Sequence, residues 1–459
     1  MRYLHDGKWP VSIKWILKWP VILSALLCLS ACSYNGTYRS NLSDVCTFEL
    51  PTDCAKHATQ ISQTGTDAEY RLGFIEYDDQ GQLRDRAQQD RVLSEYLEIA
   101  GKQDVIVLTF VHGWHHSARP EDGNITEFRK MLASVSRQEA HSSQQQQRDR
   151  RPVLGVYIGW RGDSLDIPVI NHATFWDRKA TAHEVGRKGV TEALLRLEEL
   201  VNVRNTFKDG DPPSTSRLVV IGHSFGGAVV YSSLQKILND RFIDSRKGKN
   251  FGGNAEGFGD MVILMNPAFE ALRFSSLFEL SQEKCRGYFP GQLPKLAILT
   301  SESDYATKLA FPAGRFFSTV FERHRDMERY ECPRPGMSNS RTVTIPQWKA
   351  DRNTIGHFKP YLTHKLMPAS EQGPESFDLE RAYSDWSAHD VDQADIYTTV
   401  DLISMQKTTA RNPYMNIAVD KELMDGHNDI WGDNIIGFIS ELITVSTTPQ
   451  QVYEQLLQN

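Results

Sequence analysis

Residues 218–230 read Leu-Val-Val-Ile-Gly-His-Ser-Phe-Gly-Gly-Ala-Val-Val, and this stretch decides the fold. Its first four residues are apolar and mostly β-branched, which predicts a buried strand. A Gly-x-Ser-x-Gly motif follows at 222–226, and small and apolar residues that can begin a helix come directly after it. A strand, a tight turn and a helix around this motif are typical of a turn that exposes a nucleophilic serine.

The chemistry of this turn depends on its two glycines. Gly222 and Gly226 leave room for neighbouring backbone, so that Ser224 can project above the sheet. The amide of Phe225 then points to the place where an oxyanion would form. A phosphate-binding loop is the alternative for a Gly-rich turn, but the stretch has neither a Lys-Ser/Thr ending nor a Gly-x-Gly-x-x-Gly pattern. We therefore interpret Ser224 as a nucleophile.

Further apolar runs alternate with helical patterns along the chain. The runs predict strands at 70–77, 104–111, 153–160, 261–267, 293–300 and 414–419. Helical spacing of apolar residues lies between them, at 92–99, 128–135 and 180–203, and again at 435–445. This alternation predicts an α/β fold with a mostly parallel central sheet and helices on both faces.

One long stretch breaks the alternation. Residues 310–413 are rich in proline, glycine, charged and aromatic residues. We predict a cap-like insertion there, before the last strand, which divides the core into residues 67–309 and 414–459.

The N-terminus is predicted to be a targeting segment. Basic residues precede an apolar run at 21–29, and Leu-Ser-Ala-Cys ends at Cys32. This resembles a bacterial lipoprotein signal, which implies cleavage after residue 31 and a lipid on Cys32. Ser33 then favours an outer-membrane lipoprotein of the bacterial cell envelope that faces the periplasm. An uncleaved anchor is the alternative, but the apolar run is shorter than the ~20 residues needed to span a bilayer.

The cysteines fit an oxidising compartment. Residues 32–66 are polar and turn-rich, which predicts a tether and entry segment. Besides the signal region, the chain contains Cys46, Cys54, Cys285 and Cys332. Two disulfides are expected, with neighbours in sequence as the simplest pairing, although spacing does not determine connectivity. Zinc binding is the alternative, but no Cys-x-x-Cys spacing supports it.

A second loop beside the predicted nucleophile ends the strand at 104–111. It reads His112-Gly113-Trp114, which resembles the His-Gly-x oxyanion loop of α/β-hydrolases and implies the Trp114 amide as a second donor. Together with His115 and His116, His112 also suggests a metal site. No second ligand cluster with metal-like spacing is apparent, so we expect these histidines to shape the loop and predict no metal.

The order of candidate catalytic residues carries the wider resemblance. Ser224, then an acid after a strand, then a histidine past the last strand match the order in α/β-hydrolases. Over about residues 70–445, without the insertion, the chain resembles bacterial α/β-hydrolases of the esterase or lipase type. The resemblance implies Ser224 as nucleophile, His427 as the proton-transferring base and Asp304 as its orienting acid.

Each of the two partners has an alternative. Glu302 lies two residues before Asp304, but Asp304 lies further beyond the strand end, where a loop can turn it inward. His389 precedes the last predicted strand, against the expected chain order. His223, next to the nucleophile, is expected to face away from it.

We therefore expect a lipid-anchored serine hydrolase that cleaves a small-molecule or lipid ester through an acyl-enzyme, with no metal or organic cofactor. A net charge of -7 and a pI near 6.1 give no reason to expect nucleic acid as a partner. An acyltransferase with the same residues is one alternative. A non-catalytic binding module of the cell envelope is another.

Overall fold

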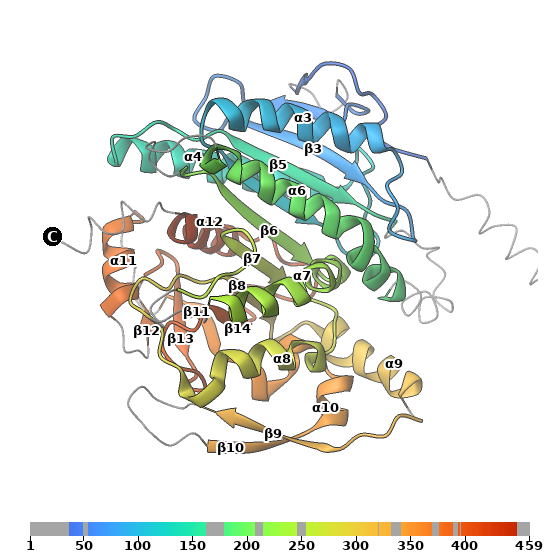
Figure 1. Cartoon of the computed structure of the whole chain (residues 1–459), viewed down its shortest axis with the longest axis vertical. Coiled ribbons are helices and arrows are strands. Elements are labelled where there is room, and N and C mark those ends of the chain that lie inside the picture. The colour runs from blue at the N-terminus through green and yellow to red at the C-terminus, as the bar shows by residue number, and fades with distance from the viewer. Residues whose placement is uncertain are drawn as a thin grey trace, which may run out of the picture.

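A mixed, mostly parallel sheet forms the centre of the molecule (Figure 1). The computed structural model describes residues 36–48, 54–161, 179–206, 214–245, 254–319, 321–331, 341–369, 376–388, 393–394 and 396–447. Among these, twelve strands form the sheet, in the spatial order β1 (Cys46–Phe48), β2 (Thr59–Ser62), β3 (Tyr70–Glu76), β5 (Val153–Gly159), β4 (Ile106–Val111), β6 (Arg217–His223), β7 (Met261–Met265), β8 (Leu296–Ser301), β14 (Tyr414–Val419), β11 (His364–Pro368), β13 (Val400–Ser404) and β12 (Gln393–Ala394).

The central strands run parallel, from β3 across to β11. In the middle, β6 pairs with β4 on one side and with β7 on the other, and Val219 lies opposite both Leu108 and Met261. Antiparallel pairs occur only toward the edges of this described sheet, at β2 with β3 and at β13 with β11 and β12. The prediction of an α/β class with a mostly parallel sheet is confirmed.

Helices cover both faces of the sheet, as predicted (Figure 1). The described helices are α3 (Arg86–Lys102), α4 (Gly123–Gln145), α6 (Thr191–Asn202), α7 (Phe225–Asp244), α8 (Ala271–Gln282), α9 (Phe311–Ser318), α10 (Gln347–Arg352), α11 (Leu379–Ala388) and α12 (Asp433–Thr447). A π-helical turn, Gly186–Val190, leads into α6. Of these helices, none is long and apolar enough to cross a membrane.

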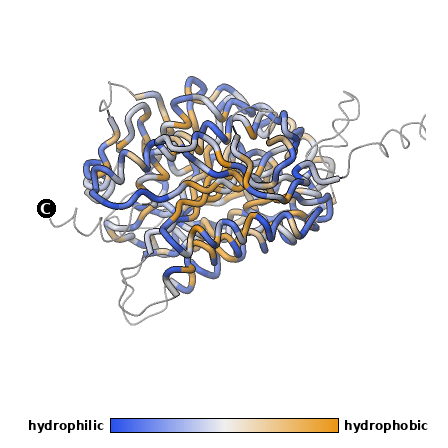
Figure 2. The backbone as a smooth tube through the Cα atoms, turned by 90° about the horizontal axis from the view of Figure 1, so that it is seen from above, coloured by the Kyte–Doolittle hydropathy of each residue, from blue (hydrophilic) through white to orange (hydrophobic). Residues whose placement is uncertain are grey.

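The core has one apolar layer on each face of the sheet. Val107 belongs to the layer shared with α3, α6, α7 and α8, whereas its neighbours Ile106 and Leu108 belong to the layer shared with α4, α11 and α12. This alternation follows from the two-residue period of a strand. It explains why strands buried on both faces read as continuous apolar runs. Figure 2 shows these hydrophobic segments gathered in the middle of the molecule, with hydrophilic segments around them.

The insertion at 310–413 differs from a simple cap. Its β11 pairs in parallel with β14, and β13 and β12 continue the sheet beyond it. β14, the last strand of the sheet in the sequence, therefore pairs with a strand on each side. This pairing satisfies backbone donors and acceptors that an uncovered strand edge would leave unpaired. Other parts of the insertion, which include α9, α10 and the hairpin β9 (Asp326–Glu331) with β10 (Arg341–Pro346), lie outside the main sheet.

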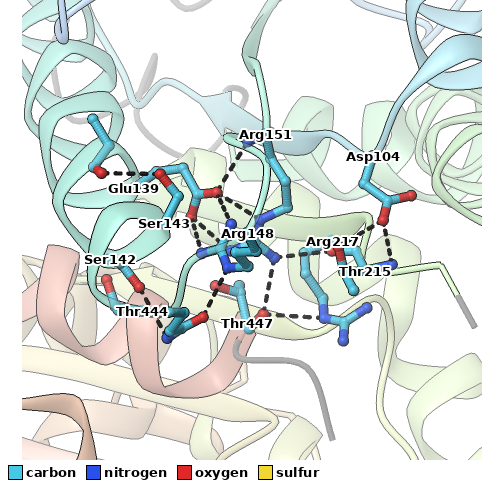
Figure 3. Close-up of polar contacts among 12 residues, drawn as sticks. Asp104, Glu139, Ser142, Ser143, Arg148, Arg151, Thr215, Arg217, Thr444 and Thr447 are labelled. Carbon is cyan, nitrogen blue, oxygen red and sulfur yellow. Dashed lines mark hydrogen bonds and ion pairs between the residues drawn. The ribbon is translucent and has the colours of Figure 1, made fainter. Parts of the chain in front are cut away.

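A buried polar network ties elements together at the amino ends of the strands (Figure 3). Glu139 of α4 accepts hydrogen bonds from Arg148 and from Arg151, with the Arg151 Nη2 at 2.7 Å. Arg151 also donates to the carbonyls of Thr215 and Thr447, at 2.9 and 3.2 Å. Burial acts to raise the pKa of Glu139, but the two guanidinium groups hold it down to about 2. The network joins α4, the start of β6 and the end of α12.

One predicted disulfide is present. Cys46 and Cys54 are bonded, with 5.7 Å between their Cα atoms. Cys285 is disulfide-bonded too. Cys332, its predicted partner, lies outside the described residues, as do Cys32 and His389.

Candidate active site

Ser224 lies at the turn between β6 and α7. Its backbone has φ 56° and ψ -121°, a strained conformation for a residue with a side chain. The backbone of the turn is packed closely: a Cβ on Gly226 would lie 2.0 Å from the Val111 carbonyl oxygen, and one on Gly222 would lie 2.8 Å from the Gly226 oxygen. Both glycines are therefore required by the turn, as the motif predicts.

Ser224, His427 and Asp304 form one hydrogen-bonded chain. His427 lies in the loop between β14 and α12, and its Nε2 is 2.7 Å from Ser224 Oγ. Its Nδ1 is 2.9 Å from Asp304 Oδ2, in the loop after β8. Because an ionised carboxylate only accepts, Nδ1 carries the proton and Nε2 is left to accept from the serine hydroxyl. Asp304 lies about 80 positions after Ser224 in the sequence, and His427 lies about 120 positions after Asp304. The structure brings these three residues together.

The three side chains differ in their exposure. Asp304 is fully buried, Ser224 is 4% exposed and the His427 side chain is 21% exposed. Burial acts to raise the pKa of Asp304, but hydrogen bonds from His427 and Thr307 lower it below its ordinary value. Asp304 is therefore ionised at neutral pH. Such an anion can orient the imidazole and stabilise it when it takes up a proton.

The alternative acid is placed elsewhere. The Glu302 side chain is about half exposed, and its Oε1 lies 3.4 Å from the Nζ of Lys365 on β11. Its backbone N–H pairs with the Val419 carbonyl. Of the two acids, Asp304 is the one that meets His427.

The two predicted oxyanion donors belong to segments that flank Ser224. Phe225 is the first residue of α7, where the helix dipole is positive. Gly113 is packed against the serine, because a Cβ there would lie 2.8 Å from Ser224 Cβ. Trp114 follows it, and its ring centroid is 6.4 Å from that of Phe225. The side chains and the turn thus hold both segments next to the hydroxyl.

The histidines of the His-Gly-Trp loop have protein partners. His112 is fully buried, stacks on Trp160, donates through Nδ1 to the Gly113 carbonyl and accepts from the Trp160 N–H through Nε2. Burial lowers the pKa of His112 to about 4, so it is neutral. His116 Nδ1 lies 2.9 Å from Asp122, the residue that caps α4. This arrangement fits the predicted loop-shaping role.

A separate group of potential metal ligands lies in the insertion. Glu322, His324 and Asp351 place ligand atoms within 4.8 Å of one another. However, Arg315 Nη2 donates to Asp351 at 2.7 Å, so one of these carboxylates already has a cation as its partner. We assign no metal to this group.

Sequence reasoning missed the residues that hold the His427 loop. Asn266, just after β7, donates through Nδ2 to the His427 carbonyl at 2.8 Å and accepts from the Ser301 N–H at 2.9 Å. His223 Nε2 also lies 3.0 Å from the His427 carbonyl, so its ring is directed to this loop. Burial lowers the pKa of His223 to about 3, which leaves a neutral ring that donates.

A signal for Asn266 was available in the sequence. The residue directly follows a predicted strand, and the carboxyl ends of parallel strands meet at one edge of a sheet. Ser224 and Asp304 also follow strands in this way. A polar residue at the same position of β7 was therefore a candidate for the site.

No family of known proteins matches the chain, and no curated protein matches it either.

Proposed function

We propose that this protein is a serine hydrolase with an α/β-hydrolase fold that cleaves a carboxylic ester through an acyl-enzyme. The observation that supports it is the hydrogen-bonded chain from Ser224 through His427 to Asp304 on a strained strand–turn–helix. A buried ion pair built for stability alone would not need a serine with positive φ at its end.

The geometry suggests the role of each group in the first half of the reaction. Ser224 Oγ attacks the ester carbonyl carbon while His427 Nε2 takes the hydroxyl proton. The amides of Phe225 and Trp114 stabilise the oxyanion of the tetrahedral intermediate. His427 then gives its proton to the departing alcohol oxygen, and the acyl group stays on Ser224.

The second half repeats these steps with water. His427 Nε2 accepts a proton from a water molecule, whose oxygen attacks the acyl carbon. Collapse of the intermediate breaks the bond to Ser224 Oγ, which takes the proton back from His427. The products are a carboxylic acid and an alcohol, and Asp304 stays ionised throughout.

The proposed location follows from the N-terminus. We propose that Cys32 carries a lipid and anchors the protein in the bacterial outer membrane. Replacement of Cys32 by serine should move the protein from the membrane fraction to the soluble fraction. Unchanged membrane partitioning of Cys32→Ser would contradict the lipid anchor.

The activity can be tested on the full chain extracted in detergent. Wild type, Ser224→Ala and Ser245→Ala would be treated with a fluorophosphonate probe and with p-nitrophenyl esters of increasing acyl length. Ser245 is a matched control because it lies at the far end of the same helix, where it hydrogen-bonds the Phe242 carbonyl. We expect Ser224→Ala to lose labelling and at least ~10³-fold in kcat/KM, and Ser245→Ala to keep both.

Two other results would change the proposal. If folded wild type is neither labelled nor able to hydrolyse any ester of the panel, the hydrolase proposal is wrong and a binding module remains. If the acyl group passes to an added alcohol in preference to water, the reaction is acyl transfer.

A further inference from the structure

The carboxylate of Asp304 has a second partner besides His427. The Thr307 N–H donates to Asp304 Oδ1 at 3.1 Å, and the Thr307 hydroxyl donates to Oδ2, the same oxygen that His427 contacts. Thr307 is 2% exposed, so water does not compete for these bonds. Each carboxylate oxygen of Asp304 is therefore held by Thr307.

The hydroxyl of Thr307 has a donor of its own. A hydroxyl carries one proton, and this proton is directed to Asp304, so any further partner must donate to the oxygen. His357 Nε2 lies 3.0 Å from Thr307 Oγ1. Burial lowers the pKa of His357 to about 4, so the ring is neutral and its Nε2–H is the donor. A chain of hydrogen bonds thus runs from His357 through Thr307, Asp304 and His427 to Ser224.

His357 comes from the insertion, and its segment is held in place by the core. It ends the 3₁₀ turn Ile355–His357. The Thr354 hydroxyl donates to the Thr307 carbonyl at 3.2 Å, which is a second link to the same threonine. Ile355 N–H donates to the Phe269 carbonyl at 3.1 Å, and Asn416 Nδ2 of β14 donates to the Ile355 carbonyl at 3.0 Å.

Close packing supports these bonds. A Cβ on Gly356 would lie 1.8 Å from Thr300 Oγ1 of β8, so the turn presses directly on the strand that precedes Asp304. The backbone just before His357 is thereby tied to the segment after β7, to β8 and to β14. The imidazole has little freedom to move away from Thr307.

We propose that His357 is a positioning residue of the triad, which acts through Thr307 to orient the Asp304 carboxylate. This inference rests on the proposed hydrolase function. It also changes the role of the insertion at 310–413, because a part of it completes the hydrogen-bonded chain of the site. His357 does not touch Ser224 or the reacting atoms.

The proposal has an electrostatic consequence with a definite sign. A hydrogen bond from Thr307 draws negative charge away from the oxygen that faces His427. Loss of that bond leaves more charge on Asp304, which favours protonated His427. The acid limb of the pH profile for kcat/KM should then move to higher pH.

Few charged or titratable groups act on His357 and His427. Asp304, Lys308 and His427 are the groups that influence His357 electrostatically, and Lys308 Nζ donates to the Glu302 carbonyl. On the other side, His223 faces His427 with 5.2 Å between ring centroids. None of them is changed by the substitutions below.

The experiment compares His357→Ala, Thr307→Val and His364→Ala in the full chain. His364 is a matched control, because it also lies in the insertion and its Nδ1 is 2.8 Å from the hydroxyl of a threonine, Thr363, but that pair does not reach Asp304. We expect His357→Ala and Thr307→Val to lower kcat about tenfold with KM within about twofold, and to raise the midpoint of the acid limb by ~0.5 pH or more. His357→Gln keeps a donor at this distance and should restore part of kcat.

The inference would be overturned if His357→Ala and His364→Ala have the same kcat and the same midpoint for the acid limb of the pH profile. The Nδ1 proton of His427, observed by NMR in the Ser224→Ala background, gives a second test that needs no activity, because this proton lies in the hydrogen bond to Asp304. There, adding His357→Ala or Thr307→Val should shift the resonance of this proton, and an unchanged resonance would refute the proposed relay. If wild type lacks activity but His357→Ala moves this resonance, the proposed function fails and the positioning role stands.

Discussion

Replacement of Glu139 by glutamine should cost about 3–5 kcal/mol of folding free energy at pH 7. Glu139 is 4% exposed and accepts from Arg148 at 2.5 and 2.9 Å and from the side chain of Arg151 at 2.7 and 2.9 Å (Figure 3). Glutamine fills the same volume but removes the negative charge. Two guanidinium groups are then left in a buried site without a carboxylate.

The magnitude follows from the pKa of Glu139. Its pKa of about 2, against an ordinary value of 4.5, corresponds to about 3 kcal/mol of stability at neutral pH. The burial of Arg151, which is fixed in place by Thr215 and Thr447, adds to the cost of losing its partner. The lowered pKa of Glu139 and the burial of Arg151 therefore both indicate that Glu139→Gln loses several kcal/mol of folding free energy.

The pH dependence has a defined sign. A lowered carboxylate pKa contributes stability that is complete above the ordinary value of 4.5 and is lost as the pH falls toward the folded value of about 2. The difference in the free energy of unfolding between wild type and Glu139→Gln should therefore be constant from pH 8 to about 5. This difference should become smaller below about pH 4.

Urea unfolding followed by tryptophan fluorescence measures this difference at each pH. Glu192→Gln is the control, because its partner Arg86 lies at 3.1 Å but both side chains are about half exposed. Exposed pairs contribute little, so its unfolding midpoint should equal that of wild type. If Glu139→Gln lies within about 1 kcal/mol of wild type at pH 7, the network does not stabilise the fold as argued.

Three further predictions concern the site and the fold around it. Asn266→Ala removes the donor to the His427 carbonyl, and we expect about 2–3 kcal/mol lower stability and about tenfold lower kcat; equal kcat would show that the loop needs no such support. Gly226→Ala should lower the free energy of unfolding, measured by calorimetry, by about 3 kcal/mol or more, because the added Cβ would collide with backbone oxygen atoms. Gly437→Ala in α12 is the control: no atom of another described segment lies within 4 Å of the added Cβ, so this variant should gain about 0.5–1 kcal/mol of stability. The free energy of unfolding should fall as the pH drops from ~6.5 toward ~4, because three buried histidines, His112, His183 and His223, have lowered pKa values in the folded protein. These histidines stay neutral in the folded protein but take up protons in the unfolded chain. Equal free energies of unfolding at pH 6.5 and pH 4 would contradict this prediction.

Local patterns account for what the sequence determined by itself. The apolar run before Gly222 predicted a strand buried on both faces, and the structure has β6 in the middle of a parallel sheet. The glycine spacing predicted the tight turn at Ser224, because steric exclusion acts between residues that are close in the chain. The positions of Asp304 and His427 after predicted strands were also readable, since strands in one parallel sheet bring their carboxyl ends to one edge.

Tertiary structure alone decided which of these groups meet. Glu302 and Asp304 follow the same strand, but only Asp304 meets His427, whereas Glu302 pairs with Lys365 from a strand of the insertion. The hydrogen bond from His357 to Thr307 depends on that insertion packing against β8 and β14. Sequence patterns report the local preference of each segment, whereas these contacts join segments tens to more than a hundred residues apart. Their formation depends on strand order and packing, and no local pattern contains that order.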